Sequence, residues 1–161
     1  MKEGLLVVSL ICTLLLSACD YDVPITVHPT RAIDERLLGD WWIWTAERVE
    51  HLKIRRFDSS NYVISHGDQD PYQRDFYRAH HSDIPGLSLV SVQRIEDEGD
   101  GKYCYFAWEL SDDGKRLTLK RINTDVIPKN TEAAATIVQL IESNRENPQL
   151  FSDSAVYSRR R

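Results

Sequence analysis

Residues 103–122, YCYFAWELSDDGKRLTLKRI, decide the fold that we predict for this chain. The two ends of the stretch, 103–110 and 116–122, are rich in aromatic and β-branched residues, which favour extended strands. Between them, residues 111–115 contain Asp-Asp-Gly, which is typical of the turn between two antiparallel strands. The stretch therefore predicts a β-hairpin whose strands present successive side chains to opposite faces.

On both sides of the hairpin the sequence predicts further short strands separated by turns, at 41–46, 51–57, 61–65, 75–81, 87–95 and 154–158. One helix precedes the last strand, because apolar residues recur at helical spacing at positions 134, 137, 138 and 141. Asn130 or Thr131 can cap this helix. We therefore predict a mainly β fold: an antiparallel meander that forms a small barrel or a strongly curved sheet. One C-terminal helix packs on it, and a final short strand follows.

Gly39-Asp40-Trp41 matches the Gly-x-Trp motif that opens the first strand of lipocalins and of the wider calycin barrels. The late helix and the closing strand follow the lipocalin order as well. The chain therefore resembles this family over residues 37–157. The resemblance implies a lipocalin-like barrel, and it implies a small hydrophobic molecule as a ligand.

A second motif lies near the N-terminus. The apolar run 5–18 ends in Leu16-Ser17-Ala18-Cys19, which matches the lipobox of bacterial lipoproteins. As a helix, this run would span about 21 Å, less than the ~30 Å hydrocarbon core of a bilayer, so we interpret it as an export signal. The resemblance implies a diacylglyceryl group on the Cys19 sulfur and cleavage before Cys19. The alternative is an ordinary Cys19 thiol after a conventional signal-peptidase cut.

Three segments follow from the lipobox: a signal peptide at 1–18, a lipid-anchored tether at 19–36 and a single β-rich domain at 37–161. Pro24 and Pro29 favour an extended path for the tether, and the alternative is that part of it packs on the domain. Asp20 resembles the retention signal of enterobacterial lipoproteins. This implies the periplasmic face of the inner membrane as the location.

Charge and cysteine content narrow the function classes. The formal net charge is −5, which argues against a nucleic-acid-binding protein. Cys12 would leave with the signal peptide, and a lipid on Cys19 would exclude a disulfide. We therefore expect Cys104 to be a lone thiol that behaves as a small buried apolar residue.

Aromatic side chains suggest one ligand pocket, formed by Trp44, Trp108 and Tyr105. The alternative, which we favour, is that these residues belong to the core of the domain. His80 and His81 suggest a metal site together with His66, Asp68 and Asp83. However, adjacent strand residues point to opposite faces, so we predict neither a metal nor another cofactor besides the lipid.

No nucleophile or phosphate-loop motif occurs in the chain, so we predict a protein that is not an enzyme. Two functions remain. In the first, an envelope lipoprotein acts as a non-catalytic interaction module that binds another envelope protein. In the second, it is a lipocalin-like binder of a small hydrophobic ligand. The first requires a filled interior and an exposed apolar patch of several hundred Å², and the second requires a cavity of roughly 300 Å³ or more.

Overall fold

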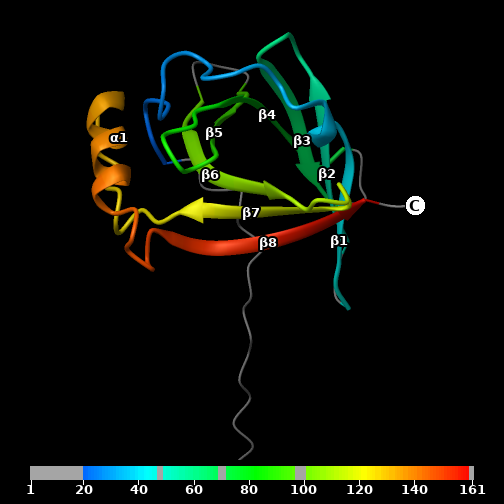
Figure 1. Cartoon of the computed structure of the whole chain (residues 1–161). Coiled ribbons are helices and arrows are strands. Elements are labelled where there is room, and N and C mark those ends of the chain that lie inside the picture. The colour runs from blue at the N-terminus through cyan, green and yellow to red at the C-terminus, as the bar shows by residue number, and fades with distance from the viewer. Residues whose placement is uncertain (1–19, 47–48, 69–71, 97–100, 160–161) are drawn as a thin grey trace, which may run out of the picture.

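The structure, a computed structural model, describes residues 20–46, 49–68, 72–96 and 101–159. Eight strands form a closed antiparallel barrel in which each strand pairs with its neighbour in the chain and β1 pairs with β8 (Figure 1). The strands are β1 (Gly39–Trp44), β2 (Val49–Arg56), β3 (Asn61–Gly67), β4 (Arg74–His81), β5 (Leu89–Arg94), β6 (Tyr103–Leu110), β7 (Arg116–Ile122) and β8 (Phe151–Arg159). The predicted antiparallel meander is confirmed, and it closes into a barrel.

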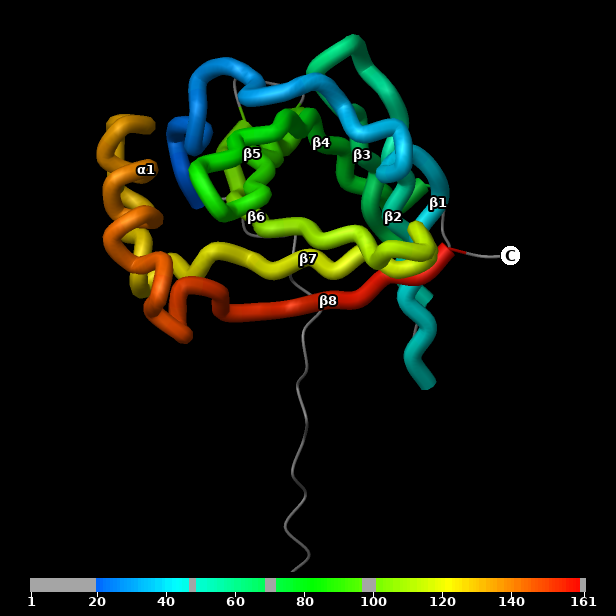
Figure 2. The backbone as a smooth tube through the Cα atoms, in the orientation of Figure 1, coloured from blue at the N-terminus to red at the C-terminus, as the bar shows by residue number. Residues whose placement is uncertain are grey.

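Alternation along each strand sends one set of side chains into the barrel, whose ring of strands is seen in Figure 2. On β6, the inward set includes Cys104, Phe106 and Trp108, all of which are buried. Leu52 and Ile54 of β2 belong to the same core. Each fully buried aliphatic side chain of this kind stabilises the fold by about 1.5–3 kcal/mol.

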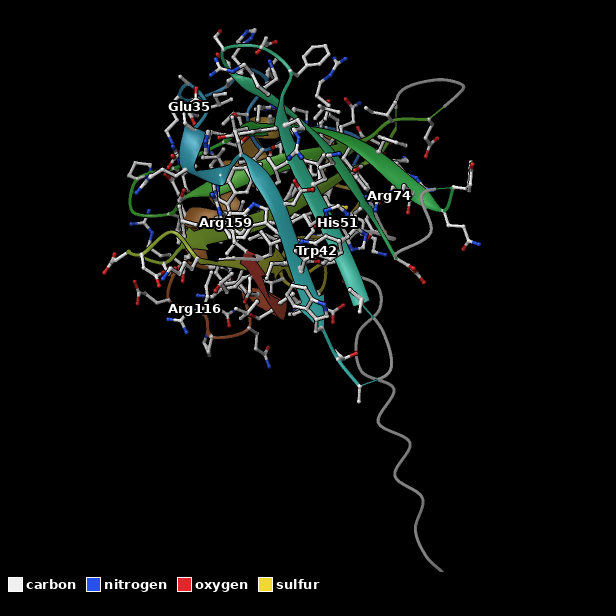
Figure 3. All side chains as sticks on the ribbon, turned by 90° about the vertical axis from the view of Figure 1, so that its right-hand side faces the viewer. Glu35, Trp42, His51, Arg74, Arg116 and Arg159 are labelled. Carbon is white, nitrogen blue, oxygen red and sulfur yellow. The ribbon has the colours of Figure 1, made fainter. Side chains whose placement is uncertain are left out.

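One end of the barrel is covered by the short 3₁₀ helix η1 (Glu35–Leu37), and we call it the η1 end. Odd-numbered strands run away from this end, and even-numbered strands run back to it. We call the opposite end, where β4 begins, the Arg74 end. Glu35 and Arg74 lie at opposite ends of the barrel in Figure 3.

The Gly-x-Trp motif holds the η1 end together. Trp41 is fully buried, and its indole Nε1 donates a hydrogen bond of 2.9 Å to the Leu37 carbonyl. The Arg159 guanidinium lies 4.4 Å from the centre of the Trp41 ring and donates to the Leu38 carbonyl at 3.1 Å. Gly39 has a φ of 144°, a backbone conformation that favours glycine. The motif therefore joins the first strand, the last strand and the covering helix.

A second core lies outside the barrel, beneath α1 (Ala134–Ser143). Ile137 and Ile141 of the helix are fully buried there. The predicted helix on the barrel is confirmed, but the predicted caps are wrong. The N-cap is Ala133, whose methyl side chain cannot form a capping bond, and the Thr131 hydroxyl donates to the Pro128 carbonyl.

The segment 20–36 packs along the barrel, as in the alternative in which part of the predicted tether packs on the domain. Tyr21 forms an antiparallel bridge with Tyr103, and its side chain is 2% exposed. Ile25 is fully buried, and its backbone N–H donates to the Ser91 hydroxyl at 3.0 Å. The predicted signal peptide and Cys19 lie outside the described residues.

Candidate functional site

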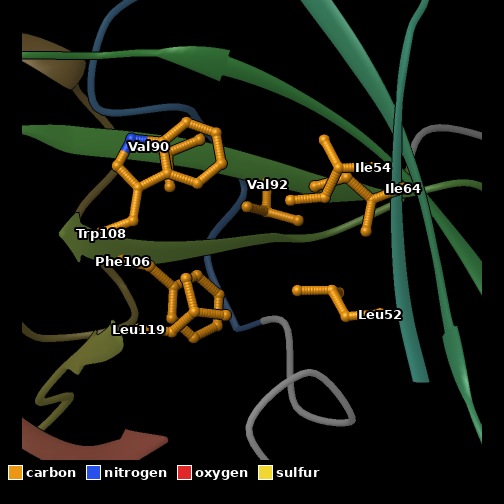
Figure 4. Close-up of a pocket in the computed structure, with 8 residues that line it drawn as sticks. All are labelled: Leu52, Ile54, Ile64, Val90, Val92, Phe106, Trp108 and Leu119. Carbon is orange, nitrogen blue, oxygen red and sulfur yellow. The ribbon is translucent and has the colours of Figure 1, made fainter. Parts of the chain in front are cut away.

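The centre of the barrel holds a small cavity of about 20 Å³ (Figure 4). A space of this size holds roughly one water molecule. Its lining is entirely apolar: Leu52, Ile54, Ile64, Val90, Val92, Phe106, Trp108 and Leu119. The interior is therefore filled almost completely by its own side chains.

Three aromatic rings close the cavity toward the η1 end. The Tyr62 hydroxyl accepts from the Asp34 backbone N–H at 2.6 Å and donates to His81 Nε2 at 2.8 Å. The Trp108 ring packs edge-on against both, 5.3 Å from Tyr62 and 5.2 Å from His81. Burial lowers the pKa of His81 to about 4 and raises the pKa of Tyr62 to about 12. Both groups are therefore neutral at physiological pH.

We call the rings of Tyr62, His81 and Trp108 the plug. Two buried nitrogen atoms of the plug have no hydrogen-bond partner in the described part of the chain. One is Trp108 Nε1. The other is His81 Nδ1, which carries the ring hydrogen because Nε2 accepts from Tyr62. Neither donor faces the cavity, whose lining has no polar atom, and His81 Nδ1 lies 4.0 Å from a carboxylate oxygen of Asp83.

Polar side chains line the interior at the Arg74 end. The Glu50 carboxylate accepts from the Tyr157 hydroxyl at 3.3 Å and lies 3.3 Å from His66 Nε2. Arg94 donates to Asp75 at 2.8 Å. These paired groups form a polar layer below the apolar cavity.

The three residues of the predicted pocket are not brought together. Trp108 points inward and lines the cavity. Trp44 lies on the outside of β1 and is 51% exposed. Tyr105 also points outward, into the core beneath α1, where it stacks on Tyr21 with ring centroids 4.0 Å apart. Alternation had placed Trp108 and Tyr105 on opposite faces of one strand, and the structure confirms this.

The outer surface of β1 to β4, which we call the β1–β4 face, carries a row of side chains that sequence reasoning missed. Trp42 stacks on His51 with centroids 3.9 Å apart and planes 8° from parallel (Figure 3). Arg74 donates to His51 Nδ1 at 2.8 Å across Gly67, which pairs with both residues. A side chain at Gly67 would collide with the backbone, because an added Cβ would lie 2.5 Å from the Gln73 carbonyl oxygen.

His51 is held neutral in this row. Since Nδ1 accepts from Arg74, Nε2 carries the hydrogen and donates to Asp40 at 2.7 Å. Burial and the nearby Arg74 charge lower the pKa of His51 against the opposing effect of Asp40. Both ring nitrogens are occupied, so this Asp–His pair does not present a general base to a substrate.

The β1–β4 face is positively charged, in contrast to the chain as a whole. Four cations point outward from β2 and β4, against the one carboxylate of Asp40: Lys53, Arg55, Arg74 and Arg78. Arg55 pairs with Asp40 at 2.6 Å. Alternation along β1 places Trp42 and Trp44 on one face, but the row across four strands depends on the register of the strand pairs.

The candidate metal ligands diverge. His80 bonds to the Thr26 carbonyl at 2.9 Å on the outside of β4, whereas His81 points into the barrel. His66 lies with Glu50 at the opposite end of the barrel from His81. No three His, Cys, Asp or Glu side chains gather as a metal site within the described residues.

Cys104 is disulfide-bonded, so the expectation of a lone thiol is wrong. The predicted burial of its side chain is confirmed, since the residue is 1% exposed. The other two cysteines of the chain, Cys12 and Cys19, both lie outside the described residues.

No protein-family model matches the chain, and no curated protein or solved structure is significantly similar to it. The eight-stranded antiparallel barrel with one helix is consistent with a lipocalin-like body. Within the part of the chain that the structure describes, no helix has the length and hydrophobicity to cross a membrane.

Proposed function

We propose that this chain is a lipoprotein of the bacterial envelope that acts as a non-catalytic interaction module. Its lipobox supports a lipid on Cys19 as the only covalent addition, and Asp20 supports retention at the periplasmic face of the inner membrane. The partner in this proposal is another envelope protein.

The filled barrel is the observation that carries the proposal. A cavity of about 20 Å³ is far below the ~300 Å³ of ordinary ligand pockets. Recognition therefore belongs to the outside of the barrel, where the β1–β4 face offers stacked rings and an excess of positive charge. Such a surface fits an acidic partner, because complementary charge speeds association and favours the correct orientation.

A photo-crosslinking amino acid at Lys53, on the β1–β4 face, should yield a discrete protein adduct in living cells. The same substitution at Lys120 is a matched control, because Lys120 is a half-buried lysine in β7, beyond the β1–β4 face. Adding Arg74→Glu should reduce the Lys53 adduct several-fold, because it reverses a charge of the face. Equal adducts from both positions, or adducts insensitive to Arg74→Glu, would contradict the proposal.

A second function is a lipocalin-like binder of a small hydrophobic ligand, with which the closed barrel is compatible. The cavity offers eight apolar side chains and no polar atom. A fatty acid or a similar molecule would place its acyl chain among these side chains. Binding would require the interior side chains to move apart, because the cavity as it stands admits only about one water molecule.

Titration of the protein with fatty acids, followed by tryptophan fluorescence, separates the two functions. The interaction module predicts no saturable change in the emission of Trp108. The lipocalin-like binder predicts saturable quenching that Trp108→Phe removes, while Trp44→Phe, which alters the outer surface, leaves it unchanged. Saturable quenching of this kind would replace the first function by the second.

A further inference from the structure

We infer that the Arg74 end of the barrel rests on the surface of a phospholipid bilayer. The contact is made by four exposed apolar residues, the Arg74 rim: Trp44, Tyr72, Phe76 and Ile95. The inference rests on the proposed lipid anchor, since it concerns how the anchored domain is oriented. It adds a protein surface to the attachment that the lipid alone would provide.

The position of Asp20 shows which end of the barrel lies next to the proposed anchor. Its backbone N–H donates to the carbonyl of Tyr103, the first residue of β6, at 3.0 Å. Its carboxylate pairs with Arg121 at 2.8 Å and with Lys129 at 3.0 Å. Asp20 is therefore fixed at the Arg74 end of the barrel.

The lipid attachment site is the residue just before Asp20, and adjacent Cα atoms are about 3.8 Å apart. No spacer then separates the acyl chains from the barrel, because the segment after Asp20 is packed on the domain. Acyl chains attached at this point enter the bilayer beside the Arg74 end. The geometry therefore brings this end, rather than the η1 end, against the headgroups.

The distribution of exposed apolar residues supports the same orientation. Trp44 is the last residue of β1, Phe76 lies near the start of β4 and Ile95 directly follows β5, all at the Arg74 end. Their exposed fractions are 51%, 50% and 50%, and Tyr72, just before β4, is 93% exposed. These residues lie around the rim rather than in one patch. Aromatic residues favour the interface between headgroups and acyl chains, so such a ring suits a flat lipid surface.

The charges at this end are largely neutralised within the protein. Arg94 pairs with Asp75 at 2.8 Å, and Lys102 pairs with Asp22. Arg74 is an exception, since it donates to the neutral ring of His51, but these paired cations are not available to attract anionic lipids from a distance. The contact should depend on the apolar residues and should persist at high salt, where electrostatic binding weakens.

Quenching by brominated phospholipids tests the contact. The full-length lipidated protein is placed in vesicles of phosphatidylethanolamine and phosphatidylglycerol whose acyl chains carry bromine, which quenches tryptophan only at short range. We compare two variants in a Trp44→Phe background: Phe76→Trp at the Arg74 rim and Phe57→Trp at the η1 end. They are matched, because Phe76 is 50% exposed and Phe57 is 57% exposed.

The new tryptophan of Phe76→Trp should fluoresce much less in brominated than in unbrominated vesicles. The new tryptophan of Phe57→Trp should fluoresce equally in both. The difference should be unchanged at high salt. Equal quenching at both positions, or none at either, would overturn the inference. Palmitate labelling at Cys19 distinguishes the two possible failures. A labelled protein without rim quenching refutes only the orientation, whereas an unlabelled protein refutes the anchor.

Discussion

Cys19→Ala should abolish the incorporation of radioactive palmitate into this protein in growing bacteria. The Cys19 sulfur is the only attachment point that the lipobox provides, and alanine offers no nucleophile for the diacylglyceryl group. Cleavage before residue 19 follows lipid transfer in lipoproteins, so the variant should also accumulate as the uncleaved precursor. Both effects are read from one gel, as loss of label and as slower migration.

Cys104→Ala is the matched control, because it removes a cysteine elsewhere in the chain. It should leave palmitate labelling and processing unchanged. Labelling that survives in Cys19→Ala would refute the anchor. Labelling lost in both variants would point instead to a general failure of export or folding.

The disulfide of Cys104 allows a second measurement on the palmitate-labelled protein. The chain has three cysteines, so an intramolecular partner is either Cys12 or Cys19. A Cys19 sulfur bound to lipid cannot also form a disulfide, and Cys12 would leave with the predicted signal peptide. Lipid on Cys19 and an intramolecular bridge to Cys104 therefore exclude one another in the processed chain. Palmitate-labelled molecules should accordingly carry Cys104 as a thiol that reacts with an alkylating reagent after denaturation.

The barrel was predictable because its determinants are local. Alternation in 103–110 divides Trp108 and Tyr105 between two faces, and Asp-Asp-Gly in 111–115 supplies the turn. The closure of the barrel could not be predicted in this way. It requires β1 to pair with β8 across more than a hundred residues, and an alternating sequence pattern is the same in a closed barrel and in a curved sheet.

The surface row illustrates what local patterns do not contain. Trp42, His51 and Arg74 meet because three strand pairs share one register and because Gly67 has no side chain between them. Neither the register nor the space at Gly67 can be read from the spacing of the residues. The predicted pocket of Trp44, Trp108 and Tyr105 is wrong for a related reason. It groups residues because they are aromatic, although they lie on different faces of the strands.

The path of residues 20–36 also depended on tertiary contacts. Pro24 and Pro29 are as compatible with a packed extended segment as with a free spacer. Tyr21 and Ile25 are buried because they belong to the core beneath α1, and this core exists only in the assembled fold. This packing removes the spacer and brings the proposed anchor to the barrel end.

The free energy of unfolding should fall by about 3 kcal/mol as the pH decreases from 6.5 to 4, because the folded protein holds His81 neutral. The folded pKa is about 4 and the ordinary value is 6.5. Between these values the unfolded chain binds a proton that the folded chain does not, so acid favours unfolding. Above pH 6.5 this contribution is constant, and below pH 4 the loss is complete. Urea unfolding at a series of pH values measures the effect.

Burial is the main cause of this depressed pKa, and the surrounding charges modify it. Arg31 and His80 lower the pKa of His81 further, whereas the carboxylates of Asp83 and Asp34 raise it. Protonation would also reverse the bond between Nε2 and the Tyr62 oxygen, since both nitrogens of the charged ring donate, and the Tyr62 hydroxyl hydrogen would lose its acceptor. The plug between the cavity and the η1 end is therefore sensitive to mild acid.

His81→Phe should flatten the dependence between pH 6.5 and 4, because phenylalanine keeps a ring in the cluster and does not titrate. His51 and several carboxylates still contribute to the pH dependence, so the difference between wild type and variant isolates His81. His28→Phe is the matched control, because it removes an exposed histidine outside the plug. A wild-type slope that persists in His81→Phe would show that the buried histidine does not control acid stability. A slope lost equally in His28→Phe would assign it to surface charge instead of the plug.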